Sequence, residues 1–358
     1  MNKRLIAIHL PQFHPFKEND EWWGKGFTEW TNVTKAKPRF RGHYQPHLPA
    51  DTGFYDLRLP EARQMQADMA KEYGIYGFCY YHYWFNGHRL MERPVNEILA
   101  SGEPDFPFML CWANENWARN WDGGFKDILM EQNYSREDDI VHMTYLCKEV
   151  FPDKRYIKIN GKPFFTIYKP ELFPHMKETI ETWRTVSKRF GFDLYLGFME
   201  NPRINVKEVL SYGFDIAIDF QPTNMGTFLQ HKNTIKKIIN KITKKPYSLI
   251  LDYGQYVDYQ NSQSMPDYKQ FPCVSPGWDN SCRRVNKPFI AFIKGTPQLF
   301  GKWLAKTLQK FKPYSKEENF VFINAWNEWA EGNHLEPDQK WGRAFLEETH
   351  RVITEENK

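Results

Sequence analysis

The sequence predicts an α/β protein, a single (β/α)8 barrel of the TIM type with long aromatic-rich loops at its C-terminal face. Strand-like and helix-like segments alternate about eight times along the 358 residues, a length that suits one such barrel. Most strand-like segments have apolar bodies and end in polar or aromatic residues, as strands do where they open onto a pocket. No Pro/Ser-rich linker divides the chain, so residues 1–358 are expected to form one domain.

A doubly wound sheet is the alternative architecture. Such a sheet usually carries a Gly-rich turn directly after its first strand. This chain has the sequence PQFH at residues 11–14, which follow its first predicted strand, so the barrel is favoured.

The first half of the chain opens with an apolar run, residues 5–10, which predicts the first strand. Residues 15–55 are rich in Trp, His, Gly and Pro without a clear period, so they are predicted to form one large functional loop. Residues 60–73 predict a helix, because apolar residues recur at helical spacing after Pro60. The next predicted elements are strand 75–78, helix 94–101, strand 106–111, helix 138–151 and strand 163–168.

The second half of the chain continues the alternation. Residues 223–270 show no clear pattern, and the basic run 235–245 within them is predicted to be a solvated face, with nucleic-acid or acidic-surface binding as the alternative. The predicted elements are helix 171–190, strand 194–199, helix 206–212, strand 215–220, strand 271–275, helix 297–310, strand 320–323 and helix 344–354.

Composition and charge limit the class of protein. Aromatic residues make up 17% of the chain, more than a core needs, so some are expected to line a surface or a cleft. The 48 basic and 44 acidic residues leave a net charge of +4, which argues against a nucleic-acid partner. The five cysteines stand at irregular spacing without a CxxC pair, so neither a zinc knuckle nor a redox pair is indicated.

Targeting signals are not evident in the sequence. No apolar run reaches the ~18 residues of a membrane helix. The apolar run before Pro11 is too short for the core of a signal peptide. We therefore expect a cytoplasmic protein without a membrane span, and the sequence does not indicate its oligomeric state.

The stretch 320–338 carries the strongest functional signal. An apolar strand, FVFI, is followed by Glu328 and Glu331, which lie among Trp326 and Trp329. Indole faces stack on sugar rings, and paired carboxyl groups supply and remove protons at a glycosidic bond. The alternative is a solvated turn, but exposed turns rarely hold two tryptophans so close to two acids.

Polar and aromatic residues at the other strand ends are predicted to meet Glu328 and Glu331 at one rim of the barrel. Stacking platforms together with amides and acids predict a cleft for an oligosaccharide or polysaccharide. Packing in the core is the alternative for His14 and His82, and strand alternation must turn about half of residues 80–84 away from the cleft. The predicted substrate-binding residues are His14, Tyr81, His82, Trp84, Trp112, Asn114, Glu115, Trp117, Glu200, Gln221, Trp278, Asp279, Asn327 and Trp329.

Metal and cofactor motifs are missing from the sequence. No HxH, HExxH or Asp/Asn-rich loop of the EF-hand type is present. The sequence therefore predicts no obligatory metal and no cofactor.

Six stretches of the chain resemble the WbsX-type family. The resemblance covers essentially the whole chain. Members of this family look like relatives of family 99 of the glycoside hydrolases, the endo-α-mannanase/mannosidase barrels, and the likeness to family 99 itself rests on the barrel and the motif after the eighth strand. The six stretches are LPQFH (10–14), EWTNV (29–33), YGIYGFCYYHYWF (73–85), CWANENWARNWDG (111–123), PGWDNS (276–281) and AWNEWAEGNHLEPD (325–338).

The eighth-strand motif of family 99 reads Glu-Trp-His-Glu, and residues 328–331 match it except that Ala330 replaces the histidine. The resemblance implies that Glu331 is the general acid/base that protonates the leaving oxygen. It also implies that Glu328 takes a proton from the sugar 2-hydroxyl, which gives a 1,2-anhydro sugar that water opens with retention. One carboxyl group must be protonated and the other ionised, so their environments must differ.

Three activities stay open from the sequence. The leading hypothesis is a retaining, metal-independent glycoside hydrolase-like enzyme that acts on a mannan-like or O-antigen-like bacterial polysaccharide or its precursor. WbsX-type proteins are commonly labelled glycosyltransferases of surface-polysaccharide loci, so a glycosyltransferase of O-antigen or lipopolysaccharide biosynthesis is the second hypothesis, although no DxD at a strand end and no Gly-rich diphosphate loop support it. A catalytically idle carbohydrate-binding barrel is the third.

Overall fold

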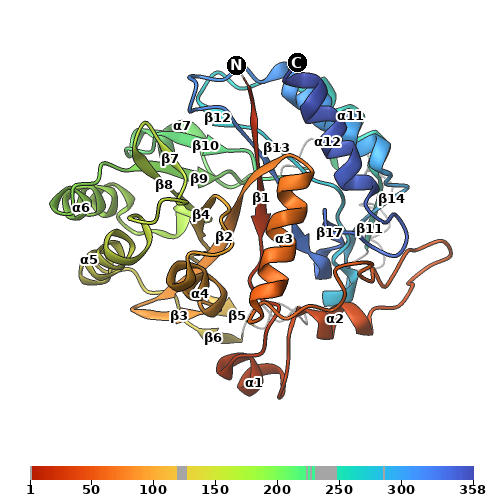
Figure 1. The fold of residues 1–358 in the computed structure, drawn as a ribbon, viewed down its shortest axis with the longest axis horizontal. Coiled ribbons are helices and arrows are strands. Elements are labelled where there is room, and N and C mark those ends of the chain that lie inside the picture. Colours follow the sequence, from red (N-terminus) through yellow and green to blue (C-terminus); the bar gives the residue numbers. More distant parts are fainter. Residues whose placement is uncertain (1, 119–126, 223–224, 226–227, 230–247, 285–286) are drawn as a thin grey trace, which may run out of the picture.

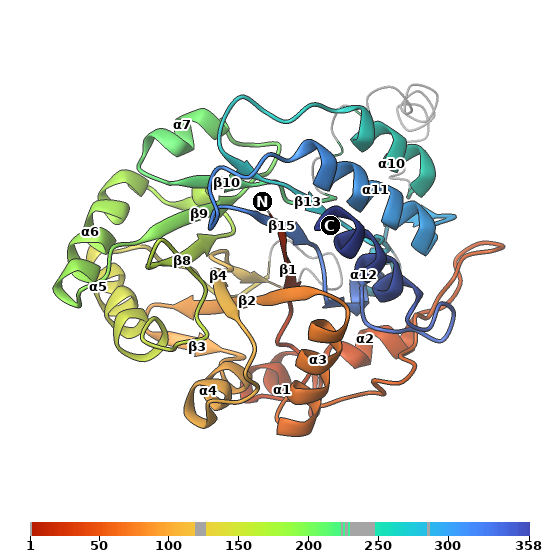
Figure 2. The ribbon, with the colours of Figure 1, turned by 45° about the horizontal axis from the view of Figure 1, so that its top comes forward.

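A ring of parallel strands stands at the centre of the molecule and helices surround it (Figure 1, Figure 2). The computed structural model describes residues 2–118, 127–222, 225, 228–229, 248–284 and 287–358. The hydrogen-bonded order of the strands is β12-β10-β9-β8-β4-β2-β1-β15-β13. Their bounds are β1 (Arg4–His9), β2 (Ile75–Phe85), β4 (Phe108–Trp112), β8 (Lys162–Ile167), β9 (Tyr195–Met199), β10 (Ile216–Ile218), β12 (Gln270–Phe271), β13 (Cys273–Val274) and β15 (Phe320–Ile323).

The ring closes through one short segment that Pro272 divides into β12 and β13. The Phe271 carbonyl accepts a hydrogen bond from the Asp219 amide at 3.0 Å, on the β10 side. The Pro272 carbonyl accepts from the Phe322 amide at 2.8 Å, on the β15 side. Proline removes a donor but keeps its acceptor, so this segment still bonds to both neighbours and joins the two ends of the sheet. The predicted (β/α)8 barrel is confirmed.

One helix follows each strand position of the ring. Apolar faces of these helices pack on the outside of the barrel, as in α11, where Phe300, Trp303 and Leu304 are buried. Among the described residues, no helix combines the length and apolar character needed to cross a membrane. The helices are α3 (Pro60–Glu72), α4 (Arg93–Ser101), α5 (Arg136–Tyr145), α6 (Met176–Arg189), α7 (Val206–Ser211), α10 (Tyr253–Ser262), α11 (Pro297–Lys310) and α12 (Ala344–Glu356).

Several predicted element boundaries are wrong. The predicted loop 15–55 contains two seven-residue helices, α1 (Lys17–Trp23) and α2 (Glu29–Lys35), each too short to show an apolar period. Helix α6 begins at Met176 and not at residue 171, because a 3₁₀ turn and Pro174 come first. The basic run 235–245 lies outside the described residues.

Strand β2 continues seven residues beyond its predicted end at 78. It forms a hairpin with β3 (His88–Leu90), in which Tyr83 pairs with Leu90. The aromatic residues predicted to end this strand therefore lie within it, with side chains on alternating faces. Other short strands outside the ring are β5 (Trp117–Ala118), β6 (Ile128–Met130), β7 (Lys158–Ile159), β11 (Leu249–Asp252), β14 (Ile290–Ile293), β16 (Asn327–Glu328) and β17 (Asn333–His334).

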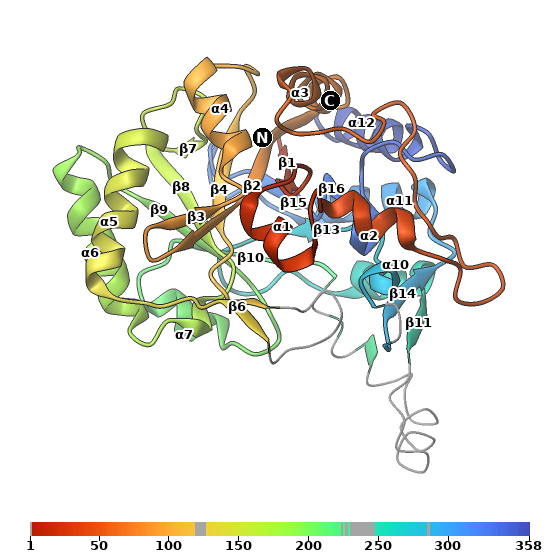
Figure 3. The same cartoon turned by 90° about the horizontal axis from the view of Figure 1, so that it is seen from below.

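Helices α1 and α2 lie at the end of the molecule toward which β1 runs, which is the carboxyl end of the barrel (Figure 1, Figure 3). The Glu29 amide, at the start of α2, donates to the Gln12 carbonyl at 3.1 Å. The Trp30 indole donates to the Tyr55 carbonyl at 2.9 Å. These bonds fold the β1–α3 connection over the mouth of the barrel.

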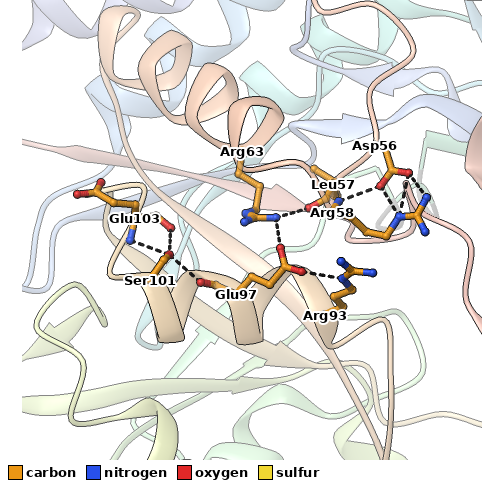
Figure 4. A network of polar contacts seen from close by, with 8 residues as sticks. All are labelled: Asp56, Leu57, Arg58, Arg63, Arg93, Glu97, Ser101 and Glu103. Atoms are coloured by element: carbon orange, nitrogen blue, oxygen red, sulfur yellow. Dashed lines mark hydrogen bonds and ion pairs between the residues drawn. The ribbon is translucent and has the colours of Figure 1, made fainter.

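An ion-pair network fixes the end of this connection to α3 and α4 (Figure 4). Arg63 of α3 is buried and donates to the Leu57 carbonyl at 2.6 Å and to the Glu97 carboxylate of α4 at 2.7 Å. Arg93 donates to the other oxygen of Glu97 at 2.6 Å. The buried guanidinium of Arg63 thus holds the end of the connection, at Leu57, against α3 and α4. Hydrogen bonds from a charged donor of this kind are strong.

Candidate active site

A pocket of about 270 Å³ opens at the carboxyl end of the ring. Residues within or after seven of the strand positions contribute to its lining, as a parallel barrel requires. Aromatic side chains and carboxyl groups face the same space, a combination that suits a sugar ring. The aromatic lining residues are Tyr81, Tyr83, Trp117, Tyr168, Phe220 and Trp278, and the acidic ones are Glu115, Glu328 and Glu331.

Glu328 and Glu331 lie in the segment that leaves the barrel after β15. The Trp326 amide donates to the Ile8 carbonyl at 2.7 Å, which continues the pairing with β1 beyond the strand. The Asn327 side chain accepts from the Leu10 amide at 2.7 Å and donates to the Leu10 carbonyl at 3.0 Å. Asn327 thus acts as a backbone clamp that positions Glu328, and it does not line the pocket.

A tight turn follows Glu331. Gly332 has φ +56°, and a Cβ atom there would lie 2.9 Å from the Asp279 Cβ, so both the conformation and the close approach require glycine. The Asp279 amide donates to the Glu331 carbonyl at 2.5 Å. The segments after β13 and β15 are therefore held against each other beside the pocket.

One guanidinium, that of Arg283, contacts three carboxyl groups. Its Nη2 atom lies 2.5 Å from Glu29 Oε1 and 3.1 Å from Glu328 Oε2, and its Nη1 atom donates to Glu331 Oε1. Glu29 is fully buried, and the other three side chains are 8–20% exposed. A planar guanidinium with several fixed donors is suited to bridging carboxylates in this way.

The local sequence explains how Arg283 reaches this position. It ends a 3₁₀ turn, Asn280–Arg283, whose first amide groups need a cap. The Asp279 carboxylate accepts from the Ser281 amide at 3.0 Å and so starts the turn. The other oxygen of Asp279 accepts from His43 at 2.6 Å and from Gln45 at 2.9 Å, so Asp279 supports the site from outside the pocket.

The cluster places one positive charge among three acids. Burial, together with the charge of Glu331, raises the pKa of Glu328 to about 8, and Arg283 opposes this shift. Burial also raises the pKa of Glu331 and of Glu29, again opposed by Arg283. Burial therefore favours the protonated form of Glu328, while the ion pair with Arg283 favours the ionised form of the more exposed Glu331.

The structure brings six of the predicted site residues to the pocket and explains why neighbouring residues lie elsewhere. Along β2, Tyr81 and Tyr83 face the pocket, whereas His82 and Trp84 face α5. His82 lies 2.9 Å from the His142 ring nitrogen, and the Trp84 indole donates to Asp138 at 3.0 Å. The six residues in the pocket are Tyr81, Glu115, Trp117, Trp278, Glu328 and Glu331.

Three further predicted residues are structural parts of the barrel. Trp112 is buried against the rings of α5 and α6, including Trp183 at 6.0 Å. Asn114 exchanges two 2.8 Å hydrogen bonds with the backbone of Lys169. His14 is buried and contacts the Phe16 ring, with centroids 5.9 Å apart.

Three more predicted residues lie behind the pocket. Glu200 accepts from Gln270 at 2.8 Å, and Gln221 donates to Asp219 at 2.9 Å. The Trp329 indole donates to Glu336 at 2.6 Å. Each of these side chains satisfies a buried polar partner, so its polar character reflects internal bonding.

Sequence reasoning missed Glu29, Arg283, Gln12, Tyr83 and Tyr168. Glu29 begins the stretch EWTNV, which carried the family resemblance, so an acid there was a usable signal. Arg283 had no signal of its own, because an arginine two residues after PGWDNS resembles any surface arginine. Only the fold shows that these residues meet.

The pocket wall contains buried polar groups suited to a ligand. Within the described part of the chain, the side-chain amide of Gln12 and the indole N–H of Trp278 have no hydrogen-bond partner. Both residues line the pocket. Buried polar atoms are normally paired, so ligand hydroxyl groups are fitting partners for them. Of the acidic lining residues, Glu328 and Glu331 already share Arg283.

The fold and the site define a carbohydrate-active enzyme of the (β/α)8 class. The aromatic lining, the unpaired polar groups and the adjacent glutamates all match that class. The chain belongs to the family described as Glycosyltransferase WbsX, whose model matches residues 5–349.

Two relatives are the proteins described as "Uncharacterized protein WxcX" from Xanthomonas campestris pv. campestris. The protein of strain ATCC 33913 is 40% identical over 353 residues, and that of strain B100 is 39% identical over the same length. Each alignment covers 98% of this chain and 49% of the relative. The chain thus spans about half the length of the curated relatives it matches.

Solved structures share the fold. The GH99 endo-alpha-mannosidase from Bacteroides thetaiotaomicron aligns with a TM-score of 0.59 and 13% identity, covering 99% of this chain and 98% of that one. A "Glycoside hydrolase-like protein" aligns with a TM-score of 0.58 and 14% identity, covering 100% of this chain and 94% of that one. At these identities the likeness shows the fold alone.

Proposed function

We propose that this protein cleaves or transfers glycosidic bonds in a bacterial oligosaccharide or polysaccharide, with Glu328 and Glu331 as its catalytic carboxyl groups. The observation that carries the proposal is the meeting of both glutamates at Arg283 beside an aromatic-lined pocket. A buried pair of acids with raised pKa values is what proton transfer at a sugar requires.

The proposed reaction follows the roles that the family 99 resemblance gives to the pair. Glu331 donates a proton to the leaving oxygen as the bond to the anomeric carbon breaks. Glu328 accepts the proton of the 2-hydroxyl, whose oxygen closes onto the anomeric carbon as a 1,2-anhydro sugar. Water, or the hydroxyl of an acceptor sugar, then attacks the anomeric carbon and opens that ring. The proton of the attacking hydroxyl passes to Glu331, and Glu328 returns its proton to the 2-oxygen.

Before substrate binds, the site favours the proton on Glu328 and not on Glu331, the proposed acid. Burial keeps it on Glu328, whereas Arg283 donates to Glu331. The proposed roles therefore require the bound substrate to draw Arg283 away from Glu331, which raises the pKa of Glu331 and allows the proton to transfer to it.

The shape of the site favours neutral sugar rings. Tyr81, Tyr168 and Trp278 offer ring faces or edges, and Gln12 offers both a donor and an acceptor to hydroxyl groups. Because a solved structure with this fold is titled an endo-alpha-mannosidase, α-linked mannose glycans are the first substrates to test.

The family description favours a second candidate, glycosyl transfer from a nucleotide sugar. A diphosphate would meet Arg283 and Arg284 in this pocket as well as Glu115, Glu328 and Glu331, so the charge of the lining does not separate the two candidates. Two glutamates joined by one guanidinium beside aromatic rings support glycosidic-bond chemistry more directly.

Product analysis tests both candidates. We would incubate the wild type, Glu328→Gln, Glu331→Gln and the exposed-surface control Glu347→Gln with α-mannosyl oligosaccharides, bacterial polysaccharides and nucleotide sugars. We expect cleaved or transferred glycans from the wild type and the control, and none from the two site variants. Turnover of nucleotide sugars alone, unaffected by both site variants, would overturn the proposal.

A further inference from the structure

We propose that His47, His334 and Asp338 form a binding site for one divalent transition-metal ion of the Zn²⁺ type. This metal would fasten the β1–α3 connection to the segment that follows the catalytic glutamates. The site lies outside the pocket described above, and the inference does not depend on the reaction proposed for that pocket.

The three side chains converge on one point. His47 Nδ1 lies 3.0 Å from His334 Nε2, and His334 Nε2 lies 3.9 Å from Asp338 Oδ2. One ligand atom from each residue lies within 4.8 Å of the others. Ligand atoms bonded to Zn²⁺ at about 2.0–2.2 Å in a tetrahedron lie roughly 3.3–3.6 Å apart, so small side-chain shifts would complete the geometry.

Hydrogen bonds outside the cluster orient two of the ligands. His334 Nδ1 lies 2.9 Å from the Glu336 carbonyl, which only accepts, so Nδ1 carries the proton and Nε2 presents a lone pair to the cluster. Asp338 Oδ1 accepts from the amides of Lys340 and Trp341 at 2.9 and 2.6 Å, and Oδ2 faces the histidines. Supporting bonds of this kind are usual around metal ligands.

The ring of His334 is also fixed by stacking. Trp329 lies parallel to it, with centroids 3.8 Å apart and an interplanar angle of 12°. His334 and Asp338 are 5% and 3% exposed. Two of the three ligands therefore have little freedom to lose when a metal binds, which favours binding.

Backbone pairing places His47 opposite the other two ligands. The Ala50 amide donates to the Pro337 carbonyl, and the Gln339 amide donates to the Leu48 carbonyl, both at 2.9 Å. These bonds hold the two segments together, so that His47 and His334, 287 residues apart in sequence, meet. Sequence spacing could not reveal a site divided in this way, which explains why the sequence predicted no metal.

The surroundings leave room for an ion and balance its charge. A cavity of about 110 Å³ includes the three residues in its lining, so a water molecule fits as a fourth ligand. Asp279 and Asp338 contribute negative charge to this cavity, and Lys340 opposes them. The Lys340 ammonium group lies over the Tyr44 and Trp341 rings, at 4.6 and 4.8 Å from their centroids.

The donor set selects the metal. Two imidazole nitrogens and one carboxylate suit Zn²⁺, Co²⁺ or Ni²⁺, whereas Mg²⁺ and Ca²⁺ prefer all-oxygen sites. His334 lies only three residues after Glu331, so a metal here would also steady the turn that carries this acid.

Calorimetry on the untagged full chain tests the site. After removal of metals with a chelator, we would titrate ZnCl₂ and, separately, MgCl₂ into the wild type, His47→Gln, Asp338→Asn and the control His350→Gln. We expect one Zn²⁺ per chain in the wild type and the control, an affinity at least tenfold weaker in the two ligand variants, and no binding of Mg²⁺. Circular dichroism would confirm that the variants are folded.

A second measurement uses only the wild type and so does not depend on how the variants fold. X-ray absorption at the zinc edge of the loaded protein should show two imidazole ligands. The proposal is overturned if the wild type binds no Zn²⁺, if folded His47→Gln and Asp338→Asn bind it as tightly as the wild type, or if the spectrum lacks imidazole scattering.

Discussion

Arg283 is the residue on which the candidate active site depends most. It is the cation shared by Glu29, Glu328 and Glu331, which are otherwise buried acids close to one another. Removing one partner of a buried ion pair leaves an uncompensated charge, which costs more than the pair itself contributes. Arg283 therefore keeps the acids close together and opposes the rise that burial causes in the pKa of each of them.

The first prediction assigns the acid. Glu331→Gln should lower turnover of an unactivated glycan by a factor on the order of 10² or more, because Gln has no proton to donate. The loss should be much smaller with a dinitrophenyl glycoside, whose leaving group departs without protonation. Steady-state kinetics on both substrates, with Glu347→Gln as the matched control, would measure this difference.

The same kinetics on Glu328→Gln provide the counter-test. If Glu328 is the base, its variant should lose activity equally on both kinds of substrate. A leaving-group effect seen in Glu328→Gln and absent in Glu331→Gln would show that the two roles are exchanged.

The second prediction concerns Arg283→Met. We expect the free energy of unfolding to fall by about 3–5 kcal/mol, because Glu29 loses its cation inside the protein. Adding Glu29→Gln should recover part of this loss, since the buried negative charge is then removed. Denaturant unfolding of both single variants and the double variant measures the coupling, and strictly additive effects would contradict the ion-pair explanation.

Among the elements, β2 shows how far the sequence predicts the site. Its apolar and aromatic content predicted a strand that opens on the pocket, and this is what the structure shows for Tyr81 and Tyr83. The sequence did not show where the strand ends, so the two-residue alternation could not be assigned to His82 and Trp84.

The third prediction uses this alternation. Tyr83→Ala should weaken glycan binding about two- to twelvefold, because one aromatic contact is worth about 0.5–1.5 kcal/mol. Trp84→Phe should leave kcat/KM within about twofold of the wild type but lower the free energy of unfolding by about 1–3 kcal/mol, since Asp138 loses its indole donor. The reverse pattern in kinetics and thermal unfolding would show that the faces of β2 are misassigned.

Helix α2 shows what the sequence could not predict. Its seven residues are too few for a helical period, so a loop was predicted where the structure forms a helix. Glu29, its first residue, reaches Arg283, which is 254 residues away in the chain. The regular elements follow from local pattern, whereas the contacts that make the site depend on long-range closure of the barrel.

For the molecule as a whole, we expect buried acids with raised pKa values to set how stability depends on pH. Glu200 lies behind the pocket and is 4% exposed. Burial, with the charge of Asp219 adding, raises its pKa to about 7. An acid with a raised pKa stabilises the fold at low pH and loses that contribution as the pH rises through the folded pKa.

The fourth prediction follows from that sign. As the pH rises from about 4.5 to about 7, the free energy of unfolding of the wild type should fall relative to that of Glu200→Gln, which resembles the protonated acid at every pH. Above pH 7 the difference should stay at its full value. The full difference is roughly 3 kcal/mol, because each pKa unit corresponds to about 1.4 kcal/mol. Denaturant unfolding from pH 4.5 to pH 9 would measure it, and a constant difference across that range would contradict the assignment.

A crystal structure of Glu331→Gln with a bound oligosaccharide, soaked from a glycan that the wild type turns over, is the most direct measurement. We predict a sugar ring against Tyr81 or Trp278, with its anomeric carbon and 2-hydroxyl facing residue 331 and Glu328, and the Arg283 guanidinium displaced from residue 331. A glycan bound only elsewhere on the protein, with Arg283 still joined to Glu29, Glu328 and residue 331, would contradict the central claim.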